Sequence, residues 1–283
     1  MEYIKLNNGV MIPQVGFGTI GLTDQKEVDE IILNAIDAGY RLFDTAQGYG
    51  NETQVGNAIK KSPIPREDLF ITTKLWLADA TYEKAKLSIQ GSLDRLQLDY
   101  IDLFLIHHPF NDIYGAYRAL IEFYKVGKIR AIGVSNLYPD RLIDFVKFNE
   151  ITPQVNQVEI HLLHQQDEAI EIMNKYHVQA QAWMPLARAH KDIFENEYVL
   201  ELAEKYHKTV GQVALRFLVQ KGVSLVVKTT KKERMIENID VFDFKLTKEE
   251  MVELKKLDTK SSIVLSHKDP KQVERFASWE RKY

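Results

Sequence analysis

Short apolar runs and amphipathic stretches alternate along the whole chain. The apolar runs have the length of strands, and such runs are typical of parallel strands that are covered by helices. They lie at Val15–Phe17, Arg41–Asp44, Leu69–Lys74, Ile101–Ile106, Ile129–Ser135, Val155–Glu159, Val178–Trp183 and Val223–Val227. This order predicts eight parallel strands, each followed by a helix.

The helices are predicted from capping residues and from apolar positions that recur every three or four residues. Asp24 and Glu27 have the spacing of a capping box, and Gly39 can end the helix that follows them. Thr230 and Glu233 repeat this spacing after the last strand. Apolar residues at helical intervals mark three of the helices: Val28, Ile31, Ile32, Ala35 and Ile36; Ala85, Ile89, Leu93 and Leu96; Ala119, Leu120, Phe123 and Val126.

Eight consecutive strand–helix units predict an α/β fold, the (β/α)8 TIM barrel, in a single domain that spans residues 1–283. Residues 1–13 are expected to form a hairpin, with Asn8–Gly9 as its turn, that caps the bottom of the barrel. Residues 14–245 would form the barrel itself. Residues 246–283 would add extra C-terminal helical structure, with a helical pattern in Leu246–Leu257 and a tail without periodicity after Asp258.

Charge and composition narrow the range of functions. Lys and Arg total 37 against 40 Asp and Glu, a net charge of -3, which argues against nucleic acid or an anionic membrane as a partner. Cysteine is absent, so thiolate nucleophiles and Cys-ligated metals are excluded. The first residues lack an export pattern, and no apolar run reaches the ~18–20 residues of a membrane span. We therefore expect a cytoplasmic protein.

A glycine-rich stretch from Gly16 to Gly21 matches the G-x-G-x-x-G pattern of dinucleotide-binding folds. In those folds the helix opens within the glycines and presents its first amides to the pyrophosphate. Here the predicted cap, Asp24, comes after the last glycine, so the helix would start too late. We favour a turn at the barrel rim, and a doubly wound dehydrogenase that uses Gly16–Gly21 is the alternative.

Ionisable and polar residues follow the apolar runs at the same end of several strands. In a barrel this end carries the active site. Asp44 ends the second strand, Tyr49 follows it, Lys74 ends the third and His107 ends the fourth. A lysine beside a tyrosine lowers the pKa of the phenol, a carboxylate holds the lysine, and an imidazole can bind a carbonyl oxygen. Each residue alone could be structural, but together they predict an acid for carbonyl reduction.

Two further clusters contain residue types that are found in binding sites. Lys228, Thr229 and Arg234 follow the eighth strand, where barrels often bind phosphate, so they could form an anion site or only a solvated basic face. His161 and His164 suggest a metal, but no third ligand has a suitable spacing. We therefore predict no metal.

Nearly the whole chain resembles the aldo-keto reductase family, in its compact bacterial type, which is similar to 2,5-diketo-D-gluconate reductases and to prostaglandin F synthase-like reductases. Many motifs in the same order carry this resemblance. They are Gly39–Ala46, Tyr49–Glu52, Ile71–Trp76, Asp99–His107, Gly127–Asn136, Gln154–Glu159 and Lys228–Asn238.

The resemblance implies an NADP-dependent oxidoreductase that reduces an aldehyde, ketone or diketone without a metal, and that is a monomer. Tyr49 would be the general acid, Lys74 the residue that tunes its pKa, Asp44 the partner of Lys74, and His107 the residue that orients the carbonyl. NADPH would be preferred, with NADH weaker, because two cations would meet the 2'-phosphate. An NADPH-binding sensor or regulatory barrel with little turnover remains an alternative.

The resemblance also assigns residues to the cofactor and to the substrate pocket. Ser135, Asn136 and Gln157 would hold the carboxamide and Trp183 would stack on the nicotinamide. The remaining cofactor residues are expected to be Thr19, Leu186, Lys228, Thr229, Thr230, Arg234, Glu237 and Asn238. The substrate pocket is expected to include Ile20, Trp76, His108 and Trp279. His108 and Ile20 replace tryptophans that are frequent in the family, so the family pattern does not identify the substrate.

Overall fold

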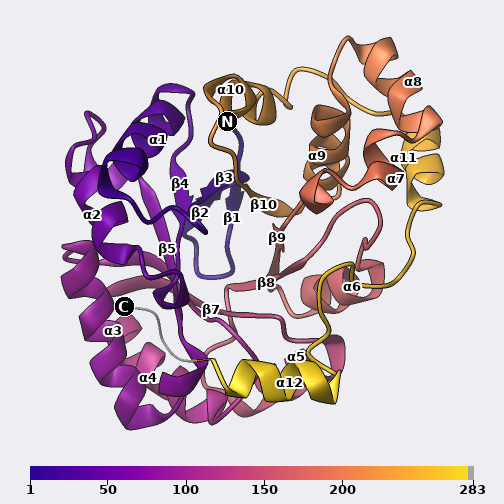
Figure 1. The fold of residues 1–283 in the computed structure, drawn as a ribbon. Coiled ribbons are helices and arrows are strands. Elements are labelled where there is room, and N and C mark those ends of the chain that lie inside the picture. Colours follow the sequence, from indigo (N-terminus) through magenta and orange to yellow (C-terminus); the bar gives the residue numbers. More distant parts are fainter. Residues whose placement is uncertain (280–283) are drawn as a thin grey trace.

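A closed barrel of eight parallel strands forms the centre of the computed structural model, which describes residues 1–279. Around the barrel each strand pairs with its neighbours in chain order, and β10 closes the ring against β3. The (β/α)8 prediction is therefore confirmed (Figure 1). The barrel strands are β3 (Val15–Gly18), β4 (Leu42–Asp44), β5 (Phe70–Leu75), β6 (Ile101–Ile106), β7 (Ile129–Ser135), β8 (Val155–Glu159), β9 (Gln179–Trp183) and β10 (Ser224–Val227).

Helices surround the barrel and cover the outer faces of the strands (Figure 1). Their apolar faces pack on the strands in one continuous core, which is why their sequences show apolar residues at helical intervals. The surrounding helices are α1 (Gln25–Asp37), α2 (Glu52–Lys60), α3 (Tyr82–Leu96), α4 (Ile113–Lys125), α5 (Pro139–Phe148), α6 (Asp167–Lys175), α7 (Lys191–Phe194), α8 (Glu197–Tyr206), α9 (Val210–Gln220) and α10 (Lys232–Ile239).

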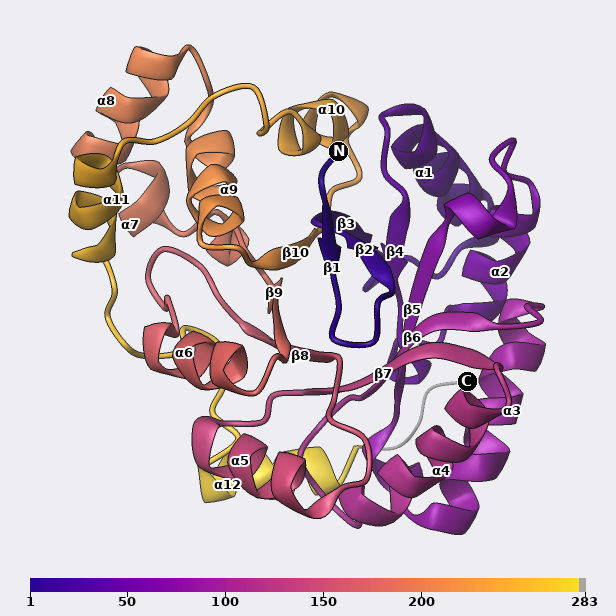
Figure 2. The same cartoon turned by 180° about the vertical axis from the view of Figure 1, so that it is seen from behind.

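A hairpin of β1 (Tyr3–Lys5) and β2 (Met11–Pro13) closes the bottom of the barrel, as predicted (Figure 2). Its side chains Leu6 and Ile12 are buried in a cluster with residues from inside the barrel. Polar bonds add to this packing, because Asn7 Nδ2 donates to the carbonyl of Pro153 at 3.1 Å. The candidate active site lies at the opposite mouth, which is formed by the carboxyl ends of the strands.

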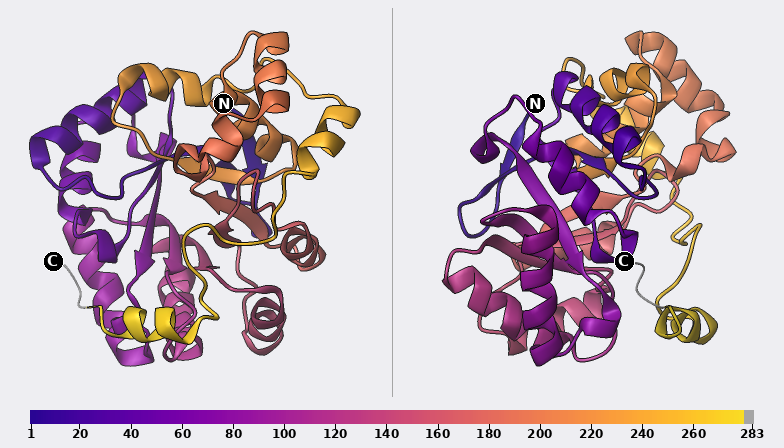
Figure 3. Two further views of the ribbon diagram at one scale, coloured as in Figure 1. Left: turned by 45° about the vertical axis from the view of Figure 1, so that its right-hand side comes forward. Right: turned by 60° about the vertical axis from the view of Figure 1, so that its left-hand side comes forward.

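The segment after Asp258 contains a helix that the sequence pattern did not predict. Beyond α11 (Lys248–Lys255) the chain runs along the barrel and ends in α12 (Pro270–Ala277), close to the ends of α4 and α5 (Figure 3). Asp269 caps α12 by accepting from the amide of Lys271, and Phe276 is its one buried side chain among the described residues. One buried side chain gives no periodicity, so the expectation of an irregular tail was wrong for this segment.

Two local details decide alternatives left open by the sequence. β3 ends at Gly18 and α1 begins at Gln25, so no helix opens within the glycines and the doubly wound alternative is wrong. The helix after β10 begins one residue later than predicted, since Lys231 is the N-cap of α10 and no side chain caps it. Thr229 Oγ1 instead accepts from the amide of Lys231 at 3.1 Å.

Within residues 1–279 no helix could cross a lipid bilayer.

Candidate active site

The strand ends bring Asp44, Tyr49, Lys74 and His107 together at the upper mouth of the barrel. Lys74 lies at the centre and is 1% exposed. Its Nζ forms an ion pair with Asp44, donates to the main-chain carbonyl of Thr45 at 3.0 Å, and lies 3.4 Å from the hydroxyl oxygen of Tyr49. The ring of Tyr49 meets the ring of His107 edge to face at 5.7 Å. The four side chains therefore form one cluster.

The turn between β4 and α2 positions Tyr49. Gln47 is buried in this turn, and its Oε1 accepts from the amide of Trp76 at 2.9 Å. Gly48 lies flat against the ring of Trp76, because a Cβ at this position would come within 2.5 Å of that ring. A side chain at residue 48 would therefore force either the ring of Trp76 or the turn that carries Tyr49 to shift. Sequence reasoning missed Gln47, whose role depends on this tertiary contact.

Burial sets the ionisation of the cluster. Burial raises the pKa of Tyr49 above its ordinary value, and the lysine charge counteracts only part of that rise. The expectation of an unusually acidic phenol was therefore wrong in direction. Burial alone would lower the pKa of Lys74, but Asp44 and Tyr49 raise it, so the lysine keeps its charge. Burial, with help from His108 and Lys74, holds the pKa of His107 well below 6.5, so this imidazole is neutral at neutral pH.

A second polar cluster joins the ends of β7, β8 and β9 beside the catalytic residues. Ser135 Oγ donates to the main-chain carbonyl of Gln157 at 2.7 Å. Asn136 Nδ2 donates to the carbonyl of His107 at 3.1 Å, and Trp183 Nε1 donates to Asn136 Oδ1 at 2.9 Å. These bonds connect all four residues predicted for the nicotinamide to the strand that carries His107.

The residues predicted for the other half of the cofactor surround the loop after β10. No ion pair joins Lys228 or Arg234 to a carboxylate within the described residues. Glu237 Oε1 accepts from the hydroxyl of Thr209 at 2.5 Å, and Asn238 is buried in α10. Leu186 lies near this group, since a Cβ on Gly211 would be 3.8 Å from Leu186 and 3.6 Å from Glu237. Thr19 lies apart, against the main chain of Asp44.

The sequence model of the Aldo/keto reductase family matches residues 14–259. The chain belongs to this family. Similar curated proteins include the glyoxal reductase of Bacillus subtilis (strain 168), 45% identical over 251 residues that cover 88% of this chain and 90% of the relative. The methylglyoxal reductase DkgA of Escherichia coli (strain K12) is 39% identical over 258 residues, covering 90% of this chain and 93% of that protein.

Solved structures of this family have the same fold. An aldo-keto reductase from a Medee basin deep-sea metagenome library is 39% identical, with a TM-score of 0.91 over 94% of this chain and 98% of that one. A Bombyx mori aldo-keto reductase in complex with NADP is 30% identical, with a TM-score of 0.88 over 99% of this chain and 98% of that one. The prediction of an NADP-dependent oxidoreductase that acts on aldehydes or ketones is therefore confirmed.

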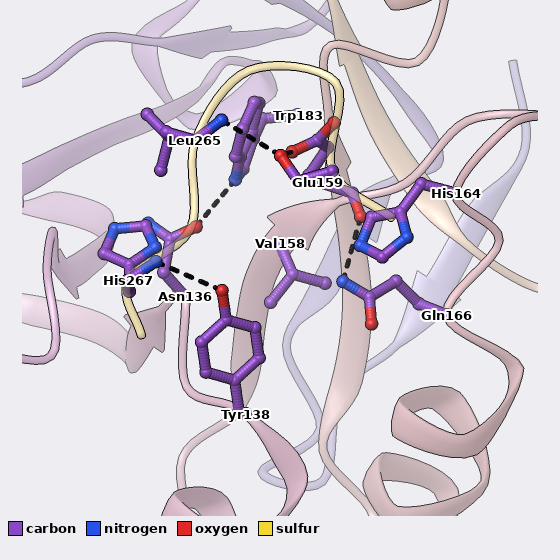
Figure 4. Close-up of a pocket in the computed structure, with 10 residues that line it drawn as sticks. Asn136, Tyr138, Val158, Glu159, His164, Gln166, Trp183, Leu265 and His267 are labelled. Atoms are coloured by element: carbon purple, nitrogen blue, oxygen red, sulfur yellow. Dashed lines mark hydrogen bonds between the residues drawn. The ribbon is translucent and has the colours of Figure 1, made fainter. Parts of the chain in front are cut away.

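In this aldo-keto reductase the last described residues, 262–279, cross the mouth of the barrel, and we name them the C-terminal strap. One end of the strap is fixed by Glu159 at the end of β8 (Figure 4). The carboxylate of Glu159 accepts from the hydroxyl of Ser262 at 2.5 Å and from the amide of Ile263 at 3.1 Å. Its Oε1 also lies 2.9 Å from Nε2 of His161, so this histidine supports the strap. No group of metal-ligating side chains converges within residues 1–279.

The other end of the strap covers the residues predicted for the substrate pocket. His267 Nε2 lies 3.0 Å from Nδ1 of His108. The main-chain amide of His267 donates to the hydroxyl of Tyr138 at 3.3 Å (Figure 4). The His108 ring stacks on His107 with ring centroids 4.4 Å apart, and Trp279 stacks on Trp76 at 6.1 Å. The structure thus brings three of the four predicted pocket residues together. The fourth, Ile20, is 55% exposed on the loop after β3.

The contact between His108 and His267 predicts a loss of stability in acid. Burial lowers the pKa of His108 to about 3 and that of His267 to about 4, from 6.5. The unfolded chain therefore binds protons at these positions as the pH falls below 6.5, whereas the folded chain does not. The contribution of these neutral histidines to the free energy of unfolding is fully present above pH 6.5. It should decrease by about 2 kcal/mol for each imidazole by pH 5. Urea unfolding between pH 7.5 and 5 measures this slope.

The variant His267→Gln should retain a hydrogen bond to His108 without titrating, so its free energy of unfolding should fall less steeply with acid. His207 ends α8 and is exposed, so His207→Asn serves as a control that keeps the original slope. An identical slope in His267→Gln and in the unaltered protein would rule out this contribution of the strap histidine.

Proposed function

We propose that this enzyme reduces small aldehydes and ketones with NADPH and that Tyr49 donates the proton. The observation that carries the proposal is the buried Asp44–Lys74 ion pair, with Nζ of Lys74 3.4 Å from the hydroxyl oxygen of Tyr49. Because burial keeps the phenol protonated at neutral pH, Tyr49 arrives at the reaction as an acid. The lysine charge then stabilises the phenolate that remains when the proton has left.

The neutral imidazole of His107 completes the proton-donating side of the site. Its ring meets that of Tyr49 edge to face, so one carbonyl oxygen can accept a hydrogen bond from both side chains. NADPH, when bound, supplies the hydride to the carbonyl carbon. Tyr49 gives its proton to the oxygen, the product is an alcohol, and the phenolate regains a proton from water.

The residues present fit NADPH, because Lys228 and Arg234 form no ion pair with a carboxylate in the described chain. Two such cations suit a phosphate. We propose that they bind the 2'-phosphate with Thr229 and Thr230, so that NADH binds more weakly. The remaining contacts proposed are Ser135, Asn136, Gln157 and Trp183 at the nicotinamide, Glu237 and Asn238 at the adenine, and Thr19 and Leu186 between them.

Small dicarbonyl compounds of the glyoxal and methylglyoxal type are the proposed substrates. The two curated relatives described above are named for these compounds. The strap is consistent with a small substrate, because Trp279 stacks on Trp76 and His267 contacts His108, so packed side chains already occupy this part of the mouth. We also propose that the enzyme is a cytoplasmic monomer. Size-exclusion chromatography with light scattering tests the oligomeric state.

A panel of carbonyl compounds, followed at the absorbance band of NADPH, tests the reaction. Glyoxal and methylglyoxal should give the highest kcat/KM, and bulky aromatic aldehydes lower values. The same panel with NADH should give at least tenfold lower kcat/KM, because the phosphate contacts are lost. Tight NADPH binding without turnover of any member of the panel would instead support the alternative of a sensor or regulatory barrel.

A further inference from the structure

A chain of buried polar side chains crosses the interior of the barrel below the site. Gln157 on β8, Gln181 on β9 and Ser224 on β10 are register partners on adjacent strands. Gln157 Nε2 lies 2.8 Å from Gln181 Oε1, and Gln181 Nε2 lies 3.2 Å from Ser224 Oγ. Neither Gln181 nor Ser224 has exposed surface. Such a layer of polar groups inside a barrel is costly unless each is hydrogen-bonded.

The two ends of this chain determine which atoms donate. At the bottom, the carbonyl of Pro13 can only accept, so the hydroxyl of Ser224, 3.4 Å away, donates to it. The oxygen of Ser224 then accepts from the amide nitrogen of Gln181, which leaves Gln181 Oε1 to face Gln157. At the top, the ionised carboxylate of Asp44 can also only accept, and Gln157 Nε2 lies 2.9 Å from its Oδ2.

Both protons of the Gln157 amide are therefore used inside the protein. One goes to Asp44 and the other to Gln181, so Oε1 is the only side-chain polar atom of Gln157 that is left for a ligand. An oxygen at this position accepts from an N–H group and repels a carboxylate. Gln157 would thus recognise the amide nitrogen of a nicotinamide, because Asp44 and Gln181 together fix the direction of its own amide.

We propose that Gln181 is a positioning residue that fixes the polarity of the Gln157 amide, and so lets the enzyme distinguish the carboxamide of nicotinamide from a carboxylate. The inference rests on the proposed NADPH site. Without the acceptor at residue 181, the Gln157 amide loses one of its two partners, and the whole amide group can rotate so that an N–H of Nε2 faces the cofactor. A carboxylate at that place could then be bound by the freed N–H.

Equilibrium binding of oxidised cofactors, read from the quenching of tryptophan fluorescence, tests this without turnover. The probes are NADP+ and its nicotinic acid analogue, in which a carboxylate replaces the carboxamide. The unaltered protein should prefer NADP+. Gln181→Met has a similar shape but no acceptor, and should reduce this preference by about tenfold, the effect of about one hydrogen bond. Gln179→Met is the matched control, because it makes the same substitution on the same strand at a side chain that bonds only to main-chain carbonyls, and it should keep the preference.

Ser224→Ala provides a second variant, which removes only one hydroxyl and supports the test if Gln181→Met does not fold. It should reduce the preference about threefold in the same direction, since Gln181 is then free to turn. An unchanged preference in both variants, or an equal loss for both probes, overturns the proposal. If the unaltered protein binds NADP+ with no preference over the analogue, the polarity argument fails although the cofactor site stands. If it binds no NADP+ at all, the proposed function itself fails.

Discussion

Replacing Tyr49 with phenylalanine is expected to lower kcat for aldehyde reduction by at least about 10²–10⁴-fold, the usual contribution of a general acid. The hydroxyl lies 3.4 Å from Nζ of Lys74, and phenylalanine has no proton to give. The affinity for NADPH should change little, because the proposed cofactor contacts are made by other side chains. Stopped-flow or steady-state assays with methylglyoxal measure kcat, and fluorescence titration measures the Kd of NADPH.

The hydroxyl of Tyr82, on the surface of α3, bonds to Glu122 and takes no part in the site, so Tyr82→Phe is a control for the loss of a phenol. Near-normal kcat in Tyr49→Phe would remove Tyr49 as the acid and leave His107 as the next candidate. A parallel collapse of NADPH binding would show that the substitution had damaged the site as a whole.

Replacing both Lys228 and Arg234 with alanine should raise the Kd of NADPH by about 100-fold and that of NADH by less than about threefold. Each charge-assisted bond to a phosphate contributes about 1–1.5 kcal/mol at an exposed site, and only NADPH carries the extra phosphate. Lys231 and Lys232 lie next to them and are exposed, so Lys231→Ala/Lys232→Ala removes the same charge nearby. Titrations with both cofactors at constant ionic strength give the four affinities.

An equal loss of affinity for NADPH and NADH in the Lys228 and Arg234 variant would argue against a phosphate at this loop. The same conclusion would follow if Lys231→Ala/Lys232→Ala raised the Kd of NADPH as much as the Lys228 and Arg234 variant does. General attraction by a basic surface does not depend on which cations are removed. High salt should weaken NADPH more than NADH in the unaltered protein.

The barrel could be predicted because its elements are specified locally. Strands that are buried on both sides are largely apolar, although β8 and β9 also carry buried Gln157 and Gln181. In the helices that cover the strands, apolar residues recur every three or four positions. Ionisable residues at the carboxyl ends of strands were equally visible, so Asp44, Lys74 and His107 could be grouped before the fold was known. The glycines at 16–21 could be set aside because the cap of the first helix, Asp24, comes too late in the chain.

Other features depend on contacts between distant segments. The helix α12 escaped prediction because only Phe276 is buried among its described residues, and the pairing of His108 with His267 joins residues 159 positions apart. The direction of the Tyr49 pKa was wrong because adjacency to Lys74 suggested an acidic phenol, whereas the cost of burying a phenolate is the larger effect. Gln181 belongs to no recognisable sequence motif. Its partners Gln157 and Ser224 become evident only when the register of the strands is known.

The hairpin and the C-terminal strap lie at opposite mouths of the barrel, and this affects how the protein should be labelled. The first residues belong to the hairpin at the bottom, while Trp279, four residues before the last, lies on Trp76. A bulky label attached to the strap near Trp279 would therefore stand beside the catalytic mouth and would obstruct it. A label at the exposed Lys5 in the hairpin would leave that mouth clear, so the hairpin suits this enzyme for immobilisation and assay.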